Sequence, residues 1–293
     1  MRGPVPGAVC HRCGMSWEVF DPRVCGVGEG PLWHPERQQF LWFDILGRRL
    51  LGEGGAAWTF DRAVTAAGWI DRDRLLVATE TGLAVLDLQR RTLDPLLAVE
   101  ADRPETRSND GRADRQGGFW FGTMGKEAQS GAGSLYRYHR GRLERLVEGL
   151  TIPNAICFSP DGRTAYYSDT ARQLVWTQRL DAEGWPVGER ELFLDLADEG
   201  LNPDGAVIDA EGGFCCAAWG AGAVLRFDAR GRQTHRLAVG GRQPSCPAFG
   251  GPEFDRLLVT TATEGMEDPG PGEGLPYLLR PGLRGLAEPR VTL

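Results

Sequence analysis

The sequence has little histidine, no long uncharged apolar run and no excess of positive charge. Its four histidines stand among 293 residues, and no serine lies in a nucleophile motif beside one of them, so a Ser-His-Asp hydrolase is not indicated. No apolar run approaches the ~18 residues of a membrane-spanning helix. The formal net charge of −7 leaves no basic face for nucleic acid or anionic lipid. We therefore expect neither nucleic acid nor membrane among the partners.

The chain also lacks a secretion signal and a disulfide framework. Residues 1–7 contain no apolar core of a signal peptide, which predicts a cytoplasmic protein. The seven cysteines are odd in number, and several lie in apolar, strand-like runs, a pattern typical of reduced and buried thiols. These are Cys157, Cys215, Cys216 and Cys246.

Residues 1–14 are interpreted as a disordered leader. Cys10 and Cys13 have the spacing of half a zinc site, but no second close pair of Cys or His follows them. Zinc sites need four ligands, so a zinc site is the less favoured interpretation. The first stretch with the composition of a strand is 16–20.

Glycine and proline are abundant, with 41 and 19 residues, so short strands and tight turns are favoured over long helices. Apolar, strand-like runs recur every ~35 to 50 residues, which is the period of propeller blades. We therefore predict an all-β, six-bladed β-propeller that forms a single domain over residues 15–293. A double-sheet sandwich is the alternative. The runs are 39–44, 74–79, 118–123, 164–169, 213–219 and 256–261.

Four polar side chains share one position in this repeat, and a sandwich would leave that unexplained. Each opens a short strand, and a turn follows at the same offset. If the units are related by rotation, the four side chains point to one spot at a mouth of the central channel. They are Glu29, Asn109, Asn154 and Asp204, and the turns are His34-Pro35, Asp114-Arg115, Ser159-Pro160 and Asp209-Ala210.

Three of these positions predict a metal site. Glu29, Asn154 and Asp204 would supply three oxygen donors, and two converging carboxylates repel each other unless a cation lies between them. Because the set contains no Cys or His, it favours Ca²⁺, Mg²⁺ or Mn²⁺, with zinc and ferrous iron left open. Three protein donors leave positions for water and substrate, as catalytic metal sites do.

The opposing interpretation is that Pro203-Asp204-Gly205 is an ordinary turn. Pro160-Asp161-Gly162 has the same letters, but it lies between the two strands of its unit, where a hairpin turn belongs. Asp204 lies instead before the first strand of its unit, at the position that Glu29 and Asn154 occupy in theirs. Position in the repeat therefore favours a ligand.

Two more charged residues lie near the predicted mouth. Arg107 precedes Asn109 by two residues, on the same side of an extended strand, where a guanidinium could bind a carboxylate or hydroxyl groups. Glu127 follows the second strand of the same unit, on a loop that could fold over the channel. From the residues alone, solvated loop charges are the simpler interpretation of both.

Five motifs occur in a fixed order along the chain: Gly28-Glu29-Gly30-Pro31-Leu32-Trp33, Arg107-Ser108-Asn109-Asp110-Gly111, Phe121-Gly122-Thr123-Met124, Ile152-Pro153-Asn154 and Asn202-Pro203-Asp204-Gly205. In this order they resemble the motifs of the SMP-30/gluconolactonase/LRE family, also called regucalcin-like proteins. The resemblance runs from about Ser16 to the C-terminus and implies a six-bladed propeller with one divalent metal at the channel mouth. It also implies a hydrolase of carboxylic esters that opens sugar lactones.

Transferred motif by motif, the resemblance implies a role for each candidate residue. The metal ligands would be Glu29, Asn154 and Asp204, with Asp204 also the catalytic acid/base, and the sugar-contacting residues would be Arg107, Asn109 and Glu127.

We therefore expect a divalent-metal-dependent lactonase that hydrolyses a sugar (aldonic acid) lactone to the open acid, as a monomer or small homo-oligomer. One alternative is a non-catalytic calcium- or metal-binding propeller, which would not need Arg107, Asn109 and Glu127. The other is a metal-dependent esterase of less polar substrates, which would need an apolar lid. The loop 264–276 is rich in Gly, Pro and acidic residues and gives that alternative little support.

Overall fold

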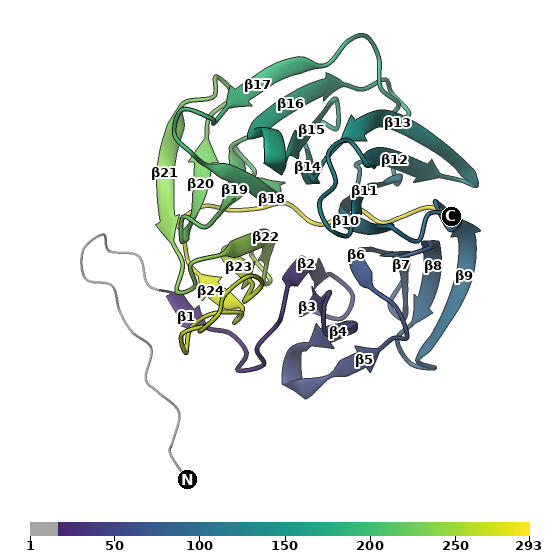
Figure 1. The fold of residues 1–293 in the computed structure, drawn as a ribbon, viewed down its shortest axis with the longest axis horizontal. Helices are drawn as coiled ribbons and strands as arrows, with labels where there is room; N and C mark the ends of the chain where they lie inside the picture. Colours follow the sequence, from purple (N-terminus) through teal and green to yellow (C-terminus); the bar gives the residue numbers. More distant parts are fainter. Residues whose placement is uncertain (1–16) are drawn as a thin grey trace.

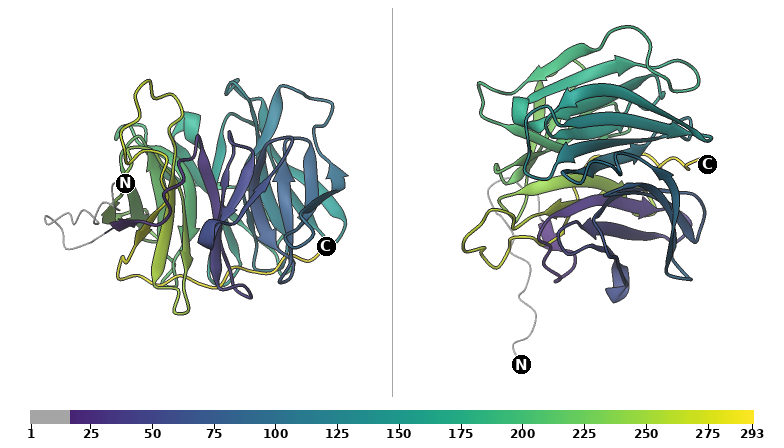
Figure 2. Two further views of the ribbon diagram at one scale, coloured as in Figure 1. Left: turned by 90° about the horizontal axis from the view of Figure 1, so that it is seen from below. Right: turned by 45° about the vertical axis from the view of Figure 1, so that its right-hand side comes forward.

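The computed structural model describes residues 17–293, and in this part of the chain six four-stranded antiparallel sheets are arranged in a ring (Figure 1). The predicted six-bladed propeller is thus confirmed. Seen from the side, the sheets stand next to one another like blades (Figure 2). The predicted leader, residues 1–14 with Cys10 and Cys13, lies outside the described residues.

Each blade contributes four strands in chain order, except that the last blade takes its fourth strand from the N-terminal end. Blades 1 and 2 contain β2 (Gly28–His34), β3 (Gln39–Asp44), β4 (Arg49–Gly52) and β5 (Ala57–Thr59), then β6 (Val64–Trp69), β7 (Arg74–Thr79), β8 (Gly82–Asp87) and β9 (Thr92–Ala98). Blades 3 and 4 contain β10 (Thr106–Ala113), β11 (Phe119–Gly125), β12 (Gly133–His139) and β13 (Arg142–Leu150), then β14 (Pro153–Phe158), β15 (Thr164–Asp169), β16 (Leu174–Arg179) and β17 (Glu191–Asp195). Blades 5 and 6 contain β18 (Asn202–Ile208), β19 (Phe214–Trp219), β20 (Ala223–Phe227) and β21 (Gln233–Ala238), then β22 (Pro244–Gly250), β23 (Arg256–Thr261), β24 (Tyr277–Leu279) and β1 (Trp17–Val19). Short 3-10 turns are η1 (Glu53–Gly55) and η2 (Thr170–Arg172).

The ring closes because the first strand of the chain pairs with the last. In β1, Trp17 lies opposite Leu279 and Val19 opposite Tyr277 of β24, so the first and last strands of the described chain share blade 6. Closure pairs an edge that would otherwise stay open. It also ties the first and last strands into one sheet.

The second strand of each blade is mostly buried because both of its faces are covered by neighbouring blades. In β3, Leu41 and Phe43 pack against Val64 and Val77 of blade 2. The alternate residues, Phe40 and Trp42, pack with residues of blade 6 such as Leu258. Side chains of a strand alternate between faces, so one apolar run fills two inter-blade cores. The five cysteines of the described chain are free and buried, as predicted.

The four first strands that carry the repeated polar residues share one irregularity. Their pairing to the second strand shifts between Glu29 and Leu32 in β2, and between Asn154 and Cys157 in β14. Equivalent shifts lie between Ser108 and Gly111 in β10 and between Pro203 and Ala206 in β18. A β-bulge of this kind bends the strand and re-aims a side chain. The repeated polar residues therefore lie inside their strands at bulges; in particular, Asp204 lies within β18 rather than before it.

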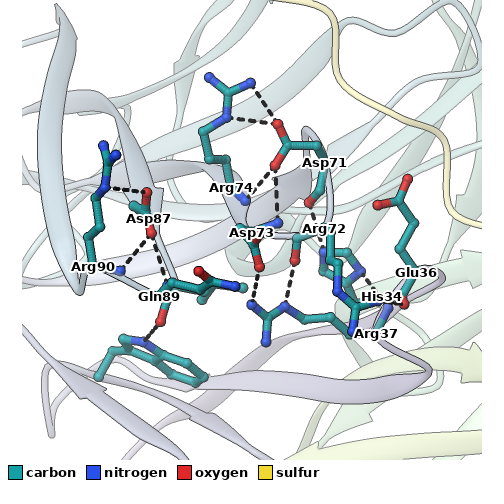
Figure 3. Close-up of polar contacts among 12 residues, drawn as sticks. His34, Glu36, Arg37, Asp71, Arg72, Asp73, Arg74, Asp87, Gln89 and Arg90 are labelled. Carbon is teal, nitrogen blue, oxygen red and sulfur yellow. Dashed lines mark hydrogen bonds and ion pairs between the residues drawn. The ribbon is translucent and has the colours of Figure 1, made fainter.

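Polar contacts link neighbouring blades on the face of the ring that lies away from the repeated polar residues. Figure 3 shows the turns of blades 1 and 2, where a ring nitrogen of His34 lies 3.1 Å from the carbonyl oxygen of Asp71. The Arg37 guanidinium pairs with Asp73 at 2.7 Å and also bonds the carbonyl of Arg72. These acids and bases neutralise one another, and they fix the turns at which the first strands end.

Residues 280–293 form a C-terminal strap across the ring (Figure 1). The strap carbonyl of Arg284 accepts from the Ala210 amide of blade 5, and the Val291 amide donates to Trp69 of blade 2, each at 2.8 Å. Both blade contacts come from the ends of first strands, so the strap covers the mouth of the channel that lies away from Glu29 and Asp204.

A candidate metal and substrate site at the channel mouth

All six residues predicted from the sequence line one pocket of about 480 Å³ at the other mouth of the channel. The pocket collects them from four blades. Glu29 comes from β2, Asn154 from β14 and Asp204 from β18, whereas blade 3 supplies the remaining three. These are Arg107 and Asn109 on β10, and Glu127 on the loop after β11.

The bulge after Glu29 requires glycine. Gly30 has φ +50°, and a Cβ atom there would lie 2.6 Å from the carbonyl oxygen of Thr65. A larger residue would therefore meet both backbone strain and a clash with blade 2. In blade 4 the residue after Asn154 is Ala155, which also has a positive φ, +56°. The same backbone conformation thus follows Glu29 and Asn154.

The two carboxylates of the predicted metal site are buried, and a neighbouring carboxylate adds to the effect of burial on the pKa of each. Burial raises the pKa of Glu29 to about 8, and the charge of Asp110 acts in the same direction. The pKa of Asp204 is raised well above its ordinary value, first by burial and then by the charge of Glu29. Two buried carboxylates that resist ionisation together are a suitable environment for a cation.

The third donor is an amide. Within residues 17–293, no group of three or more His, Cys, Asp or Glu side chains is placed to hold a metal ion. The predicted site therefore depends on Asn154, which is 3 % exposed, as the third protein donor beside Glu29 and Asp204. Two carboxylates and an amide oxygen are hard ligands and fit a hard divalent cation.

Hydrogen bonds join the predicted sugar-contacting residues to this donor. A guanidinium nitrogen of Arg107 donates to Oδ1 of Asn109 at 2.9 Å. In turn, Nδ2 of Asn109 donates to Oδ1 of Asn154, also at 2.9 Å. Glu127 lies apart from this chain of bonds, exposed at the rim, where its backbone amide donates to Gln129. The geometry thus couples Arg107 and Asn109 to the predicted metal ligand.

Of the other residues that line the pocket, four with polar or aromatic side chains were not predicted as site residues. Lys126, the only lysine of the sequence, forms an ion pair with Glu80 of blade 2 at the rim. The other three are Thr170, Trp219 and Glu264. All four lie at or just after the end of a second strand, which returns to the mouth where the first strand begins. Position in the repeat could therefore identify these four residues from the sequence, whereas their residue types have nothing in common.

Comparison with known proteins identifies the family. The family profile described as "SMP-30/Gluconolactonase/LRE-like region" matches residues 27–263, which include every predicted site residue. This chain belongs to that family. The resemblance drawn from the five motifs is therefore confirmed.

Individual relatives of this SMP-30/gluconolactonase/LRE-like protein extend over most of its length. A Rhizobium meliloti (strain 1021) protein named as a sugar lactone lactonase is 41 % identical, over 95 % of this chain and 98 % of its own. The L-arabinolactonase of Azospirillum brasilense is 35 % identical, over 88 % of each chain. The crystal structure of regucalcin from Agrobacterium tumefaciens str. C58, described as a calcium-binding protein, superposes with a TM-score of 0.92 at 38 % identity, over 95 % of this chain and 98 % of that one.

Among the few helical turns in residues 17–293, none has the length and apolar character needed to cross a bilayer.

Proposed function

We propose that this protein hydrolyses a sugar lactone to the open acid with the help of one divalent cation held by Glu29, Asn154 and Asp204. The observation that carries the proposal is the meeting of two buried, mutually repelling carboxylates with an amide oxygen in an open pocket. The relatives named as sugar lactone lactonase and L-arabinolactonase support the same substrate class.

A bound cation would polarise the lactone carbonyl and favour loss of a proton from the attacking water. Asp204 is the proposed base: it accepts that proton and returns it to the ring oxygen as the ester bond breaks. A bound cation would favour the ionised form of Asp204, which is the form that accepts a proton. Without a cation, burial and the neighbouring Glu29 raise the pKa of Asp204.

The proposed role of Arg107 and Asn109 is to orient the sugar. The side chain of Arg107 can only donate hydrogen bonds. It already donates to Oδ1 of Asn109, and this bond holds the guanidinium group in one orientation. A polyhydroxylated ring offers acceptors to such a donor, whereas an apolar ester does not. Glu127 at the rim would accept from a hydroxyl group at the far end of the substrate.

The activity is tested on metal-stripped protein with a panel of aldonolactones (glucono, galactono, arabino and xylono). Acid release is followed before and after addition of Mg²⁺, Ca²⁺, Mn²⁺ or Zn²⁺. We expect turnover of at least one lactone that is lost on stripping and restored by an ion. Tight cation binding without turnover of any lactone would instead favour a calcium-binding role like the one for which the Agrobacterium regucalcin is described.

The raised carboxylate pKa values predict how the stability of the cation-free protein depends on pH. Glu29 binds its proton more tightly in the folded state, where its pKa is about 8, than in the unfolded chain, where it is near 4.5. Its stabilising contribution is therefore complete below pH 4.5 and is lost as the pH rises through 8. Asp204 acts in the same direction. In EDTA, the melting temperature should be lower at pH 8 than at pH 6, and excess cation should remove most of that difference.

Glu29→Gln provides the control for this prediction. The variant has no proton to lose at position 29, so its melting temperature in EDTA should change less between pH 6 and pH 8. Equal pH dependence in the variant and the wild type would show that other groups cause the effect.

A further inference from the structure

Thr170 lies at the start of η2, directly after β15, with its side chain in the pocket. Its hydroxyl contacts Asn154 and the carbonyl of Pro203. We propose that Thr170 is a positioning residue that fixes the side-chain amide of Asn154 and thereby sets the affinity of the cation site. This inference rests on the proposed function, in which Asn154 is a ligand through Oδ1.

The orientation of Asn109 follows from its neighbours. Its Oδ1 accepts from Arg107, which has no acceptor atom in its side chain. Its Nδ2 donates to the carbonyl oxygen of Pro153 at 3.1 Å, and a carbonyl can only accept. The remaining N–H of Asn109 meets Oδ1 of Asn154. The Arg107 guanidinium on one side and the Pro153 carbonyl on the other thus allow only one orientation of the Asn109 side-chain amide.

Thr170 fixes Asn154 from the opposite side. The threonine hydroxyl has one proton, and at 2.6 Å it is donated to the carbonyl oxygen of Pro203. The hydroxyl oxygen is then an acceptor for Nδ2 of Asn154, 2.8 Å away. If the Asn154 amide were reversed, its Nδ2 would face Nδ2 of Asn109, and two hydrogen-bond donors would oppose each other. The atom left for a cation is therefore Oδ1, which has a second lone pair.

The position of Thr170 is itself rigid. Its backbone amide donates to the carbonyl of Ile152 at 3.0 Å, and the preceding Asp169 accepts from the amides of Thr151 and Ile152. Moreover, Pro203 directly precedes Asp204, so the same hydroxyl also contacts the backbone of a second proposed ligand. Replacing a residue that is hydrogen-bonded to a metal ligand commonly lowers metal affinity 10- to 100-fold.

The test compares Thr170→Val, which keeps the shape and loses the hydroxyl, with Thr170→Ser, which keeps the hydroxyl. Binding of Mn²⁺ and Ca²⁺ to stripped protein is measured by calorimetry. Thr170→Val should weaken binding by about tenfold or more, and Thr170→Ser should bind as the wild type does. Melting curves in EDTA, with Thr170→Ala as a second hydroxyl-free variant, show whether the fold is kept.

Ser168 offers a matched control. Its hydroxyl lies 3.4 Å from the same Pro203 carbonyl and is buried, yet it bonds no atom of the Asn154 side chain. Ser168→Ala should therefore leave cation affinity unchanged. Equal affinity loss in Ser168→Ala and Thr170→Val would overturn the proposal, because contact with Pro203 and not the amide would then be responsible.

The outcomes also separate this inference from the proposed function. Wild-type protein that binds cation but hydrolyses no lactone would leave the role of Thr170 intact and reject the activity. Full cation affinity in folded Thr170→Val would reject the role of Thr170 alone. Wild-type protein that binds none of the ions would reject both.

Discussion

Replacing Asp204 by asparagine should abolish lactone hydrolysis and weaken cation binding in the same variant. Loss of a general acid/base alone lowers rates by about 10²- to 10⁴-fold, and Asp204→Asn also removes one of the two anionic ligands. The folded state should not suffer, because the substitution is nearly isosteric and removes a buried charge that repels Glu29. Acid release measures the first effect, calorimetry with Mn²⁺ or Ca²⁺ the second, and a melting curve in EDTA the third.

The chain contains its own control for this variant. Asp161 stands in the same tripeptide as Asp204, Pro-Asp-Gly, but in the turn between β14 and β15. There its carboxylate accepts from the Ser159 hydroxyl at 2.6 Å and from the Arg163 amide at 3.0 Å. Asp161→Asn should hydrolyse lactone normally. Normal hydrolysis by Asp204→Asn would sink the proposed mechanism, and equal losses in both variants would indicate damage to the fold.

The architecture could be predicted because its determinants are local. Each second strand has six or seven residues with an apolar centre, and most of its residues are buried between two neighbouring blades. In addition, the same strand pattern occurs in all six blades, so the sequence contains six instances of it. The pocket around Glu29, Asn154 and Asp204 was predictable for the same reason, since equivalent positions of a rotational repeat meet at one mouth.

Other features could not be predicted because they depend on contacts between blades. The bulges at Glu29, Asn109, Asn154 and Asp204 have no common sequence: Gly30 and Ala155 follow Glu29 and Asn154 with similar positive φ values but different side chains. Without a bulge, residues five apart in one strand would point to opposite faces. Thr170 was missed because its role lies in hydrogen bonds to blades 4 and 5, which its own segment does not reveal.

The far end of the same strands should matter for stability. Asp114, five residues after Asn109, is completely buried with Arg137, whose Nε lies 2.7 Å from the carboxylate. The carboxylate also accepts from the Gly118 amide at 2.8 Å and from the Trp120 indole at 3.0 Å. Asp114→Ala would leave the Arg137 charge uncompensated, and removal of one partner of a buried pair costs about 3–5 kcal/mol. Urea or thermal unfolding measures the loss.

Blade 5 repeats the arrangement with one difference that sharpens this prediction. Asp209 is five residues after Asp204, and its carboxylate accepts from Nε of Arg226 and from the Gly213 amide. Arg226 has a second carboxylate, Glu211, at 3.1 Å. Asp209→Ala should therefore cost less stability than Asp114→Ala, because its arginine keeps a partner. A larger loss in Asp209→Ala would contradict this explanation.

The double variant Asp114→Ala with Arg137→Met isolates the uncompensated charge. Buried ion pairs can often be replaced by apolar residues at little cost, whereas a single unpaired charge cannot. The double variant should accordingly be more stable than Asp114→Ala alone, despite carrying two substitutions. Neither variant touches the pocket, so folded protein should keep its cation affinity. Loss of stability without loss of binding would show that one strand has a functional end at Asn109 and a structural end at Asp114.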